Sequence, residues 1–375
     1  MAGIYIHVPF CRKRCFYCDF YKTTRIEFVQ QYLDCLKKEI LLRKDYLNCK
    51  SINTIYFGGG TPSVLKISDV ESILNEIAHY FTIDGSAEIT FEVNPDDIKK
   101  QYLSELNHSG INRLSLGVQS FVDDHLKIMN RRHNGDQAKK ALALSAEAGF
   151  KNISIDLIFA IPGMNKEQLK QNLEIMIQYP VNHFSAYYLT VHKGTMFHKM
   201  VNSGKLAEID EDEGLAQFGL LIDFARERGF EQYEISNFAR NREYSKHNTA
   251  YWSGVEYLGL GPSAHSFNGS CRQWNVSETG KYMERIRNNG VFFKSERLSA
   301  KDKYNEYIMT ALRTMWGVDT RKMTEGFDSS FYRSFSMAVS ELIEQGLIRK
   351  EDTCYTLTRH GIFVSDKVIS SLFVL

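Results

Sequence analysis

Short apolar runs alternate with longer amphipathic segments along the first half of the chain. The runs are rich in β-branched and aromatic residues, as strands are, while the segments between them repeat apolar residues at helical spacing. The pattern predicts strands at 3–8, 52–57, 87–93, 113–118, 153–158 and 183–189, and helices at 27–43, 68–80, 97–107, 136–148 and 166–177. Strands and helices that alternate in this way form right-handed βαβ units, so we predict a parallel sheet.

The predicted fold class is therefore α/β. Six strand–helix units are too few to close an eight-stranded barrel, so we expect an open, partial (β/α)6 barrel of the TIM-like kind. A doubly wound sheet is the alternative. In both architectures the residues that do chemistry lie at the carboxyl ends of the strands.

Helical patterns replace this alternation after about residue 200. We predict a barrel domain over 1–200, a mostly helical and loop region over 201–298, and a winged-helix-like domain over 299–375. The last domain combines helices at 301–315 and 330–345 with a hairpin that pairs 347–349 with 355–357. The second helix carries Arg333 against Glu341 and Glu344, which is not the basic recognition helix of a DNA-binding protein.

Composition narrows the classes of protein further. The chain has 375 residues, is 43% hydrophobic and carries a formal net charge of +1. A near-neutral chain has no long-range field to attract nucleic acid or an anionic membrane, and no apolar run reaches the roughly 18 residues of a membrane span. We expect a cytoplasmic protein that binds no nucleic acid, in a compartment where thiols stay reduced.

Three cysteines follow the first predicted strand within eight residues: Cys11, Cys15 and Cys18. Thiolates at this spacing can turn toward one iron–sulfur cluster from a single loop. A fourth cysteine two residues later would saturate a cubane cluster, but Phe20 stands there. The spacing therefore predicts a cluster with one open iron, which can bind a small molecule.

Two other interpretations of the cysteines are weaker. A structural zinc site needs four ligands, usually two pairs on two loops, and the chain would have to use His7 as the fourth. A disulfide framework is disfavoured because seven cysteines is an odd number and no secretory signal precedes Tyr5. The other four cysteines are scattered and are expected to be structural.

Polar and glycine residues gather after the predicted strands. Gly58, Gly59, Gly60 and Thr61 follow the second strand, Glu92 ends the third, Gln119 ends the fourth, and Asp156 lies inside the fifth. Glycines let backbone groups approach a ligand closely, and a buried carboxylate requires a cationic or hydroxylated partner. Arg131 and Arg132 could supply that cation or bind a ligand carboxylate. A tight turn and a strand-end ion pair are the structural alternatives for the glycines and for Glu92.

The cysteine motif after Tyr5, together with the Gly-Gly-Gly-Thr-Pro run at 58–62, resembles the radical S-adenosylmethionine (SAM) superfamily, and within it the oxygen-independent coproporphyrinogen III oxidase-like branch. The resemblance implies a [4Fe-4S] cluster on the three cysteines and SAM on the open iron, in the partial barrel of the radical SAM type. The positions that match those holding SAM in this family are Tyr5, Gly59, Gly60, Thr61, Glu92, Gln119, Arg131 and Asp156.

The second half points to one subgroup of that branch. The residues His247-Asn248-Thr249-Ala250-Tyr251-Trp252 match the His-Asn-x-x-Tyr-Trp motif of the HemW heme-chaperone subgroup. The resemblance makes His247 the candidate heme ligand, with Tyr251 and Trp252 as pocket residues and His265 as a second candidate ligand. A core histidine packed among core aromatics is the alternative from the residues alone. Phe20, and a chain that begins almost at Tyr5, depart from the oxidising enzymes.

The resulting expectation is a heme chaperone that binds heme, a [4Fe-4S] cluster and SAM and delivers heme to an acceptor protein, which could itself be membrane-associated. A flavodoxin- or ferredoxin-like electron donor and a homodimer are further expectations. Whether the chain is also an enzyme stays open, and no catalytic residue is assigned. The alternatives are a coproporphyrinogen III dehydrogenase, which performs radical oxidative decarboxylation, and an iron–sulfur scaffold without radical chemistry.

Overall fold

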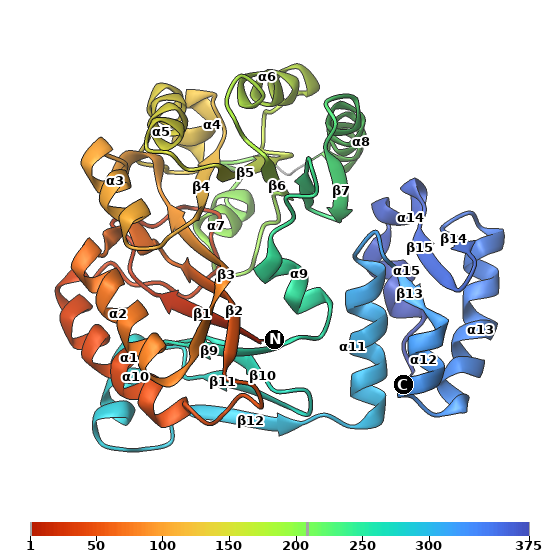
Figure 1. The fold of residues 1–375 in the computed structure, drawn as a ribbon. Coiled ribbons are helices and arrows are strands. Elements are labelled where there is room, and N and C mark those ends of the chain that lie inside the picture. Colours follow the sequence, from red (N-terminus) through yellow and green to blue (C-terminus); the bar gives the residue numbers. More distant parts are fainter. Residues whose placement is uncertain (1, 208–209, 375) are drawn as a thin grey trace.

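The computed structural model describes residues 2–207 and 210–374. Six parallel strands form the centre of the molecule, as predicted: β1 Ala2–Val8, β2 Ser51–Gly59, β3 Thr82–Val93, β4 Arg113–Gln119, β5 Asn152–Phe159 and β6 His183–Tyr188. They curve into an open partial barrel whose helices lie on the outer side (Figure 1). The predicted α/β fold with a partial (β/α)6 barrel is confirmed, and the doubly wound alternative is not observed.

The sheet continues beyond the six strands at both edges, which the sequence does not predict. Strand β9 pairs parallel to β1, and the full order of the sheet is β12-β11-β10-β9-β1-β2-β3-β4-β5-β6-β8-β7. The added strands are β7 Glu231–Glu234, β8 Asn237–Ala239, β9 Glu256–Leu260, β10 His265–Phe267, β11 Cys271–Asn275 and β12 Phe293–Arg297. They are short, and four of the five residues of β12 are exposed. Such strands lack the apolar alternation that reveals a strand in a sequence. The described part of region 201–298 therefore contains six strands besides the expected helices and loops.

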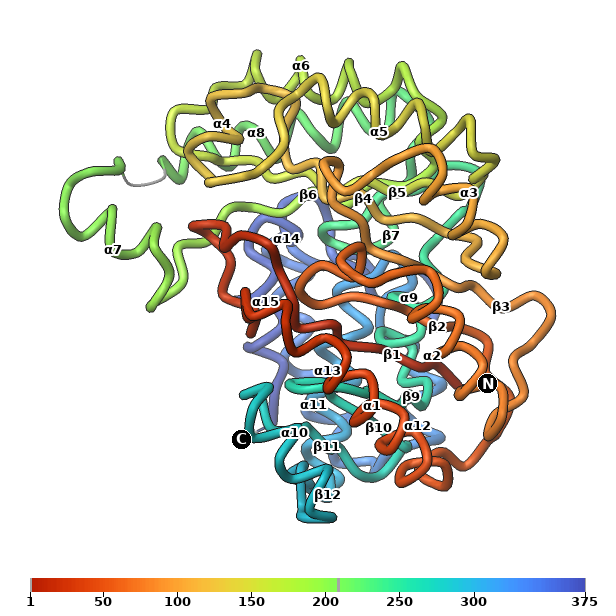
Figure 2. Tube along the Cα trace, turned by 90° about the vertical axis from the view of Figure 1, so that its left-hand side faces the viewer, coloured from red at the N-terminus to blue at the C-terminus, as the bar shows by residue number. Residues whose placement is uncertain are grey.

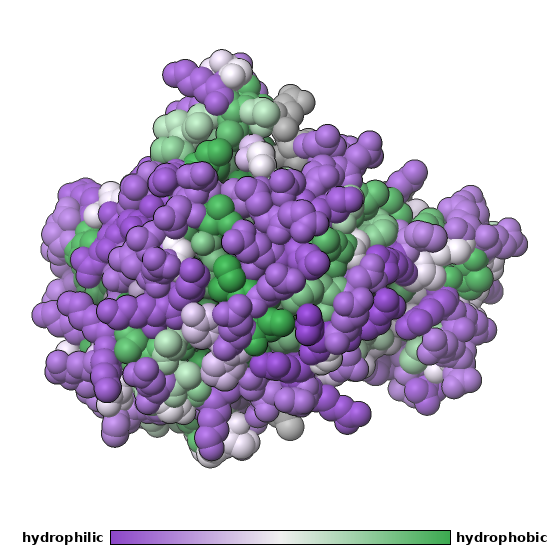
Figure 3. Space-filling model, turned by 90° about the horizontal axis from the view of Figure 1, so that it is seen from above, coloured by the Kyte–Doolittle hydropathy of each residue, from purple (hydrophilic) through white to green (hydrophobic). Residues whose placement is uncertain are grey.

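The outer helices cover the barrel with apolar faces. They are α1 Val29–Arg43, α2 Ile67–Tyr80, α3 Lys100–His108, α4 Asp123–Ile128, α5 Gly135–Glu147, α6 Lys166–Met176, α8 Glu211–Glu227 and α10 Thr279–Arg287. Helix α7 Met196–Asn202 projects from one edge of the molecule instead (Figure 2). In α1, Tyr32, Leu36 and Ile40 share one face and are fully buried in the main core. The opposite faces are polar, so the side seen in Figure 3 is mainly hydrophilic with narrow apolar patches.

Residues 300–374 form a smaller body with its own core. It contains α11 Ala300–Leu312, α12 Thr320–Gly326, α13 Ser329–Glu344, α14 Arg359–Phe363, α15 Ser365–Ser371 and a three-stranded sheet of β13 Val318–Asp319, β15 Cys354–Leu357 and β14 Ile348–Glu351. Its buried residues, from Tyr304 to Leu372, form a hydrophobic cluster separate from that of the barrel. The predicted two helices and hairpin are present, and the likeness to a winged helix stays a prediction.

A short helix lies on the open side of the barrel, between the central strands and the C-terminal body (Figure 1). This helix, α9 Lys246–Trp252, carries the His-Asn-x-x-Tyr-Trp motif and packs against β2, β9 and α11. The Ser245 side chain caps its N-terminus by accepting from the Asn248 N–H. None of the helices in the described parts of the chain is both long and apolar enough to span a membrane.

Candidate iron–sulfur and cofactor site

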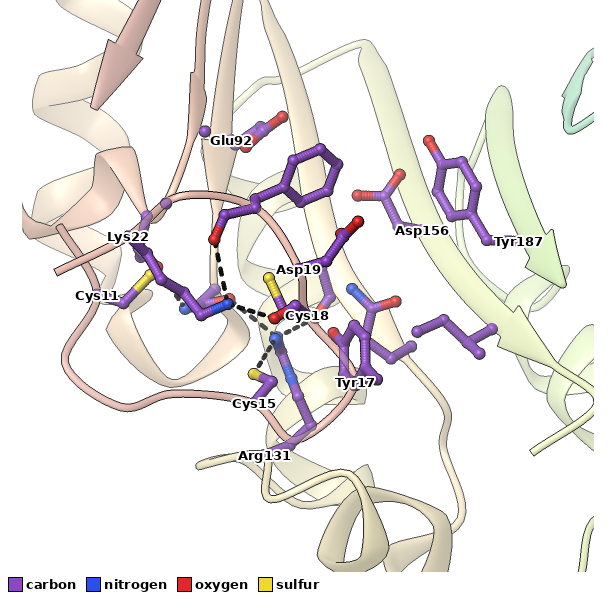
Figure 4. Close-up of a pocket in the computed structure, with 18 of the residues that line it drawn as sticks. Cys11, Cys15, Tyr17, Cys18, Asp19, Lys22, Glu92, Arg131, Asp156 and Tyr187 are labelled. Atoms are coloured by element: carbon purple, nitrogen blue, oxygen red, sulfur yellow. Dashed lines mark hydrogen bonds between the residues drawn. The ribbon is translucent and has the colours of Figure 1, made fainter. Parts of the chain in front are cut away.

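A cavity of about 530 Å³ opens at the carboxyl ends of the strands. Eleven of the predicted site residues line it: Tyr5, Cys11, Cys15, Cys18, Gly59, Gly60, Thr61, Glu92, Gln119, Arg131 and Asp156. Figure 4 shows the three thiols on one side of this space and the two acids, Glu92 and Asp156, on the other. Residues from five different strands and their loops thus meet at the edge where an α/β barrel places its chemistry.

The cysteines lie on a loop, residues 11–23, that is closed by backbone hydrogen bonds. The Cys11 N–H donates to the Thr23 carbonyl at 2.9 Å, and the Thr23 N–H donates to the Pro9 carbonyl at 2.7 Å. Inside the loop, Lys22 Nζ donates to the Cys18 carbonyl at 2.7 Å. These bonds hold a segment without regular secondary structure in one conformation, and this cluster loop can therefore present its three thiols together.

Each of two thiols has a polar neighbour from the barrel. Thr61 Oγ1 donates to Cys11 Sγ at 3.4 Å, and Arg131 Nη1 donates to Cys15 Sγ at 3.4 Å. Burial raises the pKa of Cys11, and the nearby charges of Cys18 and Cys15 add to that rise while the Thr61 hydrogen bond opposes it. Thiolates crowded in this way need a cationic centre to stabilise them, which iron would supply.

The donor set fits an iron–sulfur cluster better than a single ion. Among the described residues, no three His, Cys, Asp or Glu side chains converge on one metal-sized position. The three thiols nevertheless line one cavity, as ligands of a multi-iron cluster would. The zinc alternative also loses its fourth ligand, because His7 Nδ1 pairs with the Tyr5 hydroxyl at 3.1 Å and Nε2 with the Tyr21 carbonyl at 3.3 Å. Burial lowers the pKa of His7 to about 4.

The glycine run brings the end of β2 against the end of β1. Gly59 has φ +106°, and a Cβ on it would lie 2.7 Å from the His7 ring. A Cβ on Gly60 would lie 2.8 Å from the carbonyl oxygens of Val8 and Phe10, and the Gly60 N–H already donates to Val8. These glycines are therefore required by the close approach of two strands beneath the cluster loop, in addition to any contact with a ligand.

The surroundings of Glu92 and Asp156 suit a cationic or hydroxylated ligand. Tyr56 donates to Glu92 Oε1 at 2.8 Å. Burial, followed by the charge of Asp156, raises the pKa of Glu92 to about 7. Burial also raises the pKa of Asp156 to about 6, although hydrogen bonds from Ser185 and Ser115 oppose the rise. An ammonium group in this cavity would lower both pKa values and gain from both carboxylates.

Arg131 is a cation that lines the same cavity and opposes the rise that burial causes in the pKa of Asp156. Its Nη2 donates to the Gly117 carbonyl at 2.6 Å and to Asn94 Oδ1 at 2.9 Å. Its Nε is buried and has no partner in the described structure. Asn94 also donates to Thr61 Oγ1 at 3.3 Å, so it joins the arginine to the threonine beside Cys11. Asn94 was not singled out as a site residue, although its position two residues after Glu92 at a strand end was a usable signal.

The motif on α9 lies behind the wall of the cavity and does not line it. The His247 ring stacks on Tyr56 and on the cavity residue Tyr5, with ring centroids 5.2 and 6.3 Å away. His247 is 2% exposed, and both ring nitrogens have partners: Nδ1 pairs with Thr54 Oγ1 at 2.8 Å and Nε2 with the Tyr251 hydroxyl at 2.9 Å. Burial lowers the pKa of His247 to about 3. The Trp252 indole stands near the Arg313 guanidinium, and His265 stacks on Trp274. The structure does not bring these residues to the thiols.

Four residues at the mouth of the cavity were not predicted as binding residues. Phe20 comes from the cluster loop, Tyr187 and Tyr188 end β6, and His192 follows on the segment that leads to α7. The large aromatic side chains of Phe20, Tyr187 and Tyr188 are exposed, where burial would be expected. Two adjacent tyrosines at the carboxyl end of a predicted strand were the available signal.

Comparison with known proteins agrees with this geometry. Residues 5–176 match the family model of the Radical SAM superfamily, and residues 298–364 match that of the HemN C-terminal domain. The fold resembles that of coproporphyrinogen III oxidase (HemN) from Escherichia coli, with a TM-score of 0.86 at 23% identity, covering 100% of this chain and 90% of that one.

Similarity in sequence extends over the whole chain. It is 31% identical to the heme chaperone HemW of Bacillus subtilis, covering 99% of both proteins. It is 31% identical to the heme chaperone HemW of Lactococcus lactis, covering 99% of this chain and 97% of that protein. The chain therefore belongs to the radical SAM superfamily and, within it, to the HemW family.

Proposed function

We propose that this protein is a heme chaperone, which binds heme together with a [4Fe-4S] cluster and SAM and transfers the heme to an acceptor protein. The observation that carries the proposal is the cavity itself, where three thiols, two acids and exposed aromatic side chains share one opening. The full-length likeness to proteins named heme chaperone HemW supports it.

The cluster is assigned to Cys11, Cys15 and Cys18, and the cavity above it to SAM. When bound, the cluster supplies an open iron that can chelate a ligand through amino and carboxylate groups and can donate an electron. Glu92 and Asp156 stabilise positive charge and bind hydroxyl groups. Arg131 counters thiolate and carboxylate charge. Tyr5, Gln119, Thr61 and the two glycines close the walls.

The candidate heme ligand His247 requires a rearrangement in this proposal. Heme iron could bind its Nε2 only after the bond to Tyr251 breaks and α9 leaves its position against β2. A buried group that loses its partner costs about 1–3 kcal/mol. The same reasoning applies to Tyr251, which hydrogen-bonds to the ring, and to Trp252, which lies on the same helix. The motif thus works as a heme site only in an opened form of the barrel.

We further propose that an acidic redox protein of the flavodoxin or ferredoxin kind reduces the cluster at the cluster loop. Residues 11–25 carry Arg12, Lys13, Arg14, Lys22 and Arg25 against the single acid Asp19. Such a local excess of positive charge steers an acidic partner in a salt-dependent way. A membrane-associated heme acceptor, a cytoplasmic location and a homodimer complete the proposal.

Oxidative decarboxylation of coproporphyrinogen III is the second candidate, because the fold matches that of HemN. The position two residues after Cys18 separates the candidates, since Phe20 leaves no fourth thiol there and its side chain is 69% exposed. The test is anaerobic reconstitution of the cluster, followed by incubation with coproporphyrinogen III and SAM in one sample and heme in another. Stoichiometric heme binding without protoporphyrinogen formation supports the chaperone, whereas turnover to protoporphyrinogen would make the protein an oxidase.

A further inference from the structure

We propose that the heme is bound at the mouth of the cavity, with His192 Nε2 as an axial ligand of its iron. The aromatic side chains of Phe20, Tyr187 and Tyr188, here called the aromatic rim, form the apolar contact surface. The inference rests on the proposed function and names the heme site within it. It replaces His247 as the ligand in the folded, closed form of the protein.

His192 has the geometry of an oriented metal ligand. Its Nδ1 lies 3.6 Å from the Asp19 carboxylate, while Nε2 has no hydrogen-bond partner among the residues described, and the side chain is 47% exposed. Metal-ligating histidines commonly place one nitrogen against a carboxylate, which fixes the tautomer and leaves the other nitrogen free for the metal. Both His192 and Asp19 line the cavity, so the free nitrogen stands where a ligand can reach it.

The two segments that carry this pair are held together. The Phe197 N–H of α7 donates to the Phe16 carbonyl of the cluster loop at 3.0 Å. The Thr195 hydroxyl donates to the His192 carbonyl at 2.7 Å, which fixes the turn before α7. Figure 2 shows the cluster loop and α7 projecting from the same edge of the molecule. His192 is therefore positioned relative to the cluster by backbone bonds rather than carried on a free loop.

The aromatic rim gives this site an apolar surface. Phe20 is 69% exposed, Tyr187 44% and Tyr188 39%, and all three line the same cavity. Tyr188 is fixed by an edge-to-face contact with Phe159 and by close packing against Gly214. Large aromatic residues that gather around one opening mark a ligand site, and flat rings prefer flat, apolar partners. A porphyrin is such a partner.

The charges near the mouth also suit heme. Heme carries carboxylate side groups at one edge, and Lys13 lines the cavity without an ion pair in the described structure. Lys22, on the same loop, donates only to the backbone carbonyls of Cys18 and Phe20. A basic edge, an apolar surface and an imidazole nitrogen thus occur together at the mouth. Around His247 the nitrogens are taken and the side chain is buried.

The experiment is a hemin titration of the cluster-loaded full chain, followed by its Soret absorption. His192→Ala should weaken heme binding at least tenfold and remove the spectrum of imidazole-bound heme. Adding free imidazole to His192→Gly should restore that spectrum, which a merely structural defect would not allow. The matched control is His198→Ala, since His198 is another histidine of the same segment but does not line the cavity, and it should bind heme like the unchanged protein.

Two results would overturn the inference while leaving the chaperone proposal intact. One is an unchanged spectrum and affinity in His192→Ala. The other is loss of imidazole-bound heme in His247→Ala when circular dichroism shows that variant folded. If the unchanged protein binds no heme at all, the proposed function itself fails. Asp19→Asn should raise the reduction potential of the bound heme, because the negative charge of a carboxylate 3.6 Å from the imidazole Nδ1 stabilises ferric iron; an unchanged potential contradicts the assigned pair.

Discussion

The mouth of the barrel and the region around α9 contain the same kinds of residues in opposite states. Both bring histidine and tyrosine side chains close to the central strands. At the mouth, His192 and the aromatic rim are exposed and the His192 Nε2 is free within the described structure. At α9, His247 is 2% exposed and both of its nitrogens are hydrogen-bonded. The type of residue is therefore not enough to define a ligand site. A histidine can bind a ligand only where its ring nitrogen is unpaired and accessible.

The difference follows from what each region does for the fold. Glu88 accepts hydrogen bonds from the backbone N–H groups of Lys246 and His247, both at 3.0 Å, and so anchors the start of α9 to β3. Thr54 and Tyr251 complete the partners of the His247 ring. The His247 ring and the Glu88 carboxylate are paired in this way, although Thr249 Oγ1 and Trp252 Nε1 of the same helix are buried without a partner in the described structure. Paired buried groups stabilise one conformation. At the mouth, Arg131 Nε stays unpaired and the two acids have raised pKa values, which is typical of a site awaiting a ligand.

The largest effect is expected from removing a cluster thiol. Cys15→Ala should lose the cluster completely, because three thiolates are the smallest set that leaves a single open iron. Iron and sulfide analysis with the visible absorption of the reconstituted protein measures this. The matched control is Cys354→Ala, a partly buried cysteine in the C-terminal body, which should keep its full iron content. A cluster that survives in Cys15→Ala would show that another residue holds it.

The next largest effect concerns the α9 region and should appear in stability. His247→Ala removes a buried ring that bonds Thr54 and Tyr251, so the free energy of unfolding of the heme-free protein should fall by about 3 kcal/mol. His192→Ala should change it by less than about 0.5 kcal/mol, since that side chain is half exposed. Urea unfolding followed by circular dichroism compares the two. Equal losses would remove the distinction between the two regions.

A third effect is a pH dependence of SAM binding. Glu92 has a pKa of about 7, raised by burial and by Asp156, with Tyr56 and the Gly59 N–H opposing the rise. The carboxylate is the form that binds a cationic ligand, so SAM affinity should fall up to about tenfold per unit as the pH drops below 7. Asp156 faces the same group and has a pKa of about 6, so its protonation extends the fall in SAM affinity to lower pH.

Equilibrium dialysis of labelled SAM between pH 5.5 and 8.5 measures this dependence. Glu92→Gln should bind more weakly at pH 8 and lose the part of the pH dependence near pH 7, while the part near pH 6 that Asp156 supplies remains and the iron content stays unchanged. In the SAM-free protein, the free energy of unfolding should change with pH in the opposite direction to the SAM affinity. Because the Glu92 pKa is raised, the folded state holds a proton on this group between pH 4.5 and about 7 that the unfolded state does not hold. This proton stabilises the fold at low pH, and the stabilisation is lost as the pH rises through that range. A pH-independent affinity in the unchanged protein would exclude Glu92 as the charged contact.

The smallest effect is expected at the aromatic rim. Phe20→Ala removes an exposed ring, so stability should not change, but heme affinity should fall a few-fold because part of the apolar contact is lost. The Soret titration used for His192 measures it. A suitable comparison is Met337→Ala on α13, because Met337 is 80% exposed and far from the cavity, and it should leave heme affinity unchanged. A reduction in both variants would point to non-specific adsorption of heme.

Much of the fold and the thiol site was predictable from the sequence. The six central strands have strong apolar patterns, and the three cysteines follow the first of them directly. Strands β7 to β12 were not predictable, because such short strands pair through backbone groups that leave little pattern in the side chains. The aromatic rim was not predictable for a related reason. Tyr187, Tyr188 and His192 form a site only together with the loop at 11–23, which lies far from them in the sequence.

His247 shows that a sequence motif can also predict a ligand whose atoms are not free in the folded structure. Its motif indicated a heme ligand, and the alternative from the residues alone was a core histidine. Whether a histidine is free depends on Thr54, almost 200 residues earlier, and on Gly3, where a Cβ would lie 2.7 Å from the Thr54 hydroxyl and 3.3 Å from the His247 ring. Contacts of this range are set by tertiary packing and leave no local signal.

The most direct test of the account is an anomalous difference map, collected at the iron edge, from crystals of the cluster-loaded protein soaked with hemin. We predict two iron sites at the barrel mouth, one beside Cys11, Cys15 and Cys18 and the other next to His192 with the porphyrin against the aromatic rim. An iron peak beside His247 on α9, with none next to His192, would contradict it.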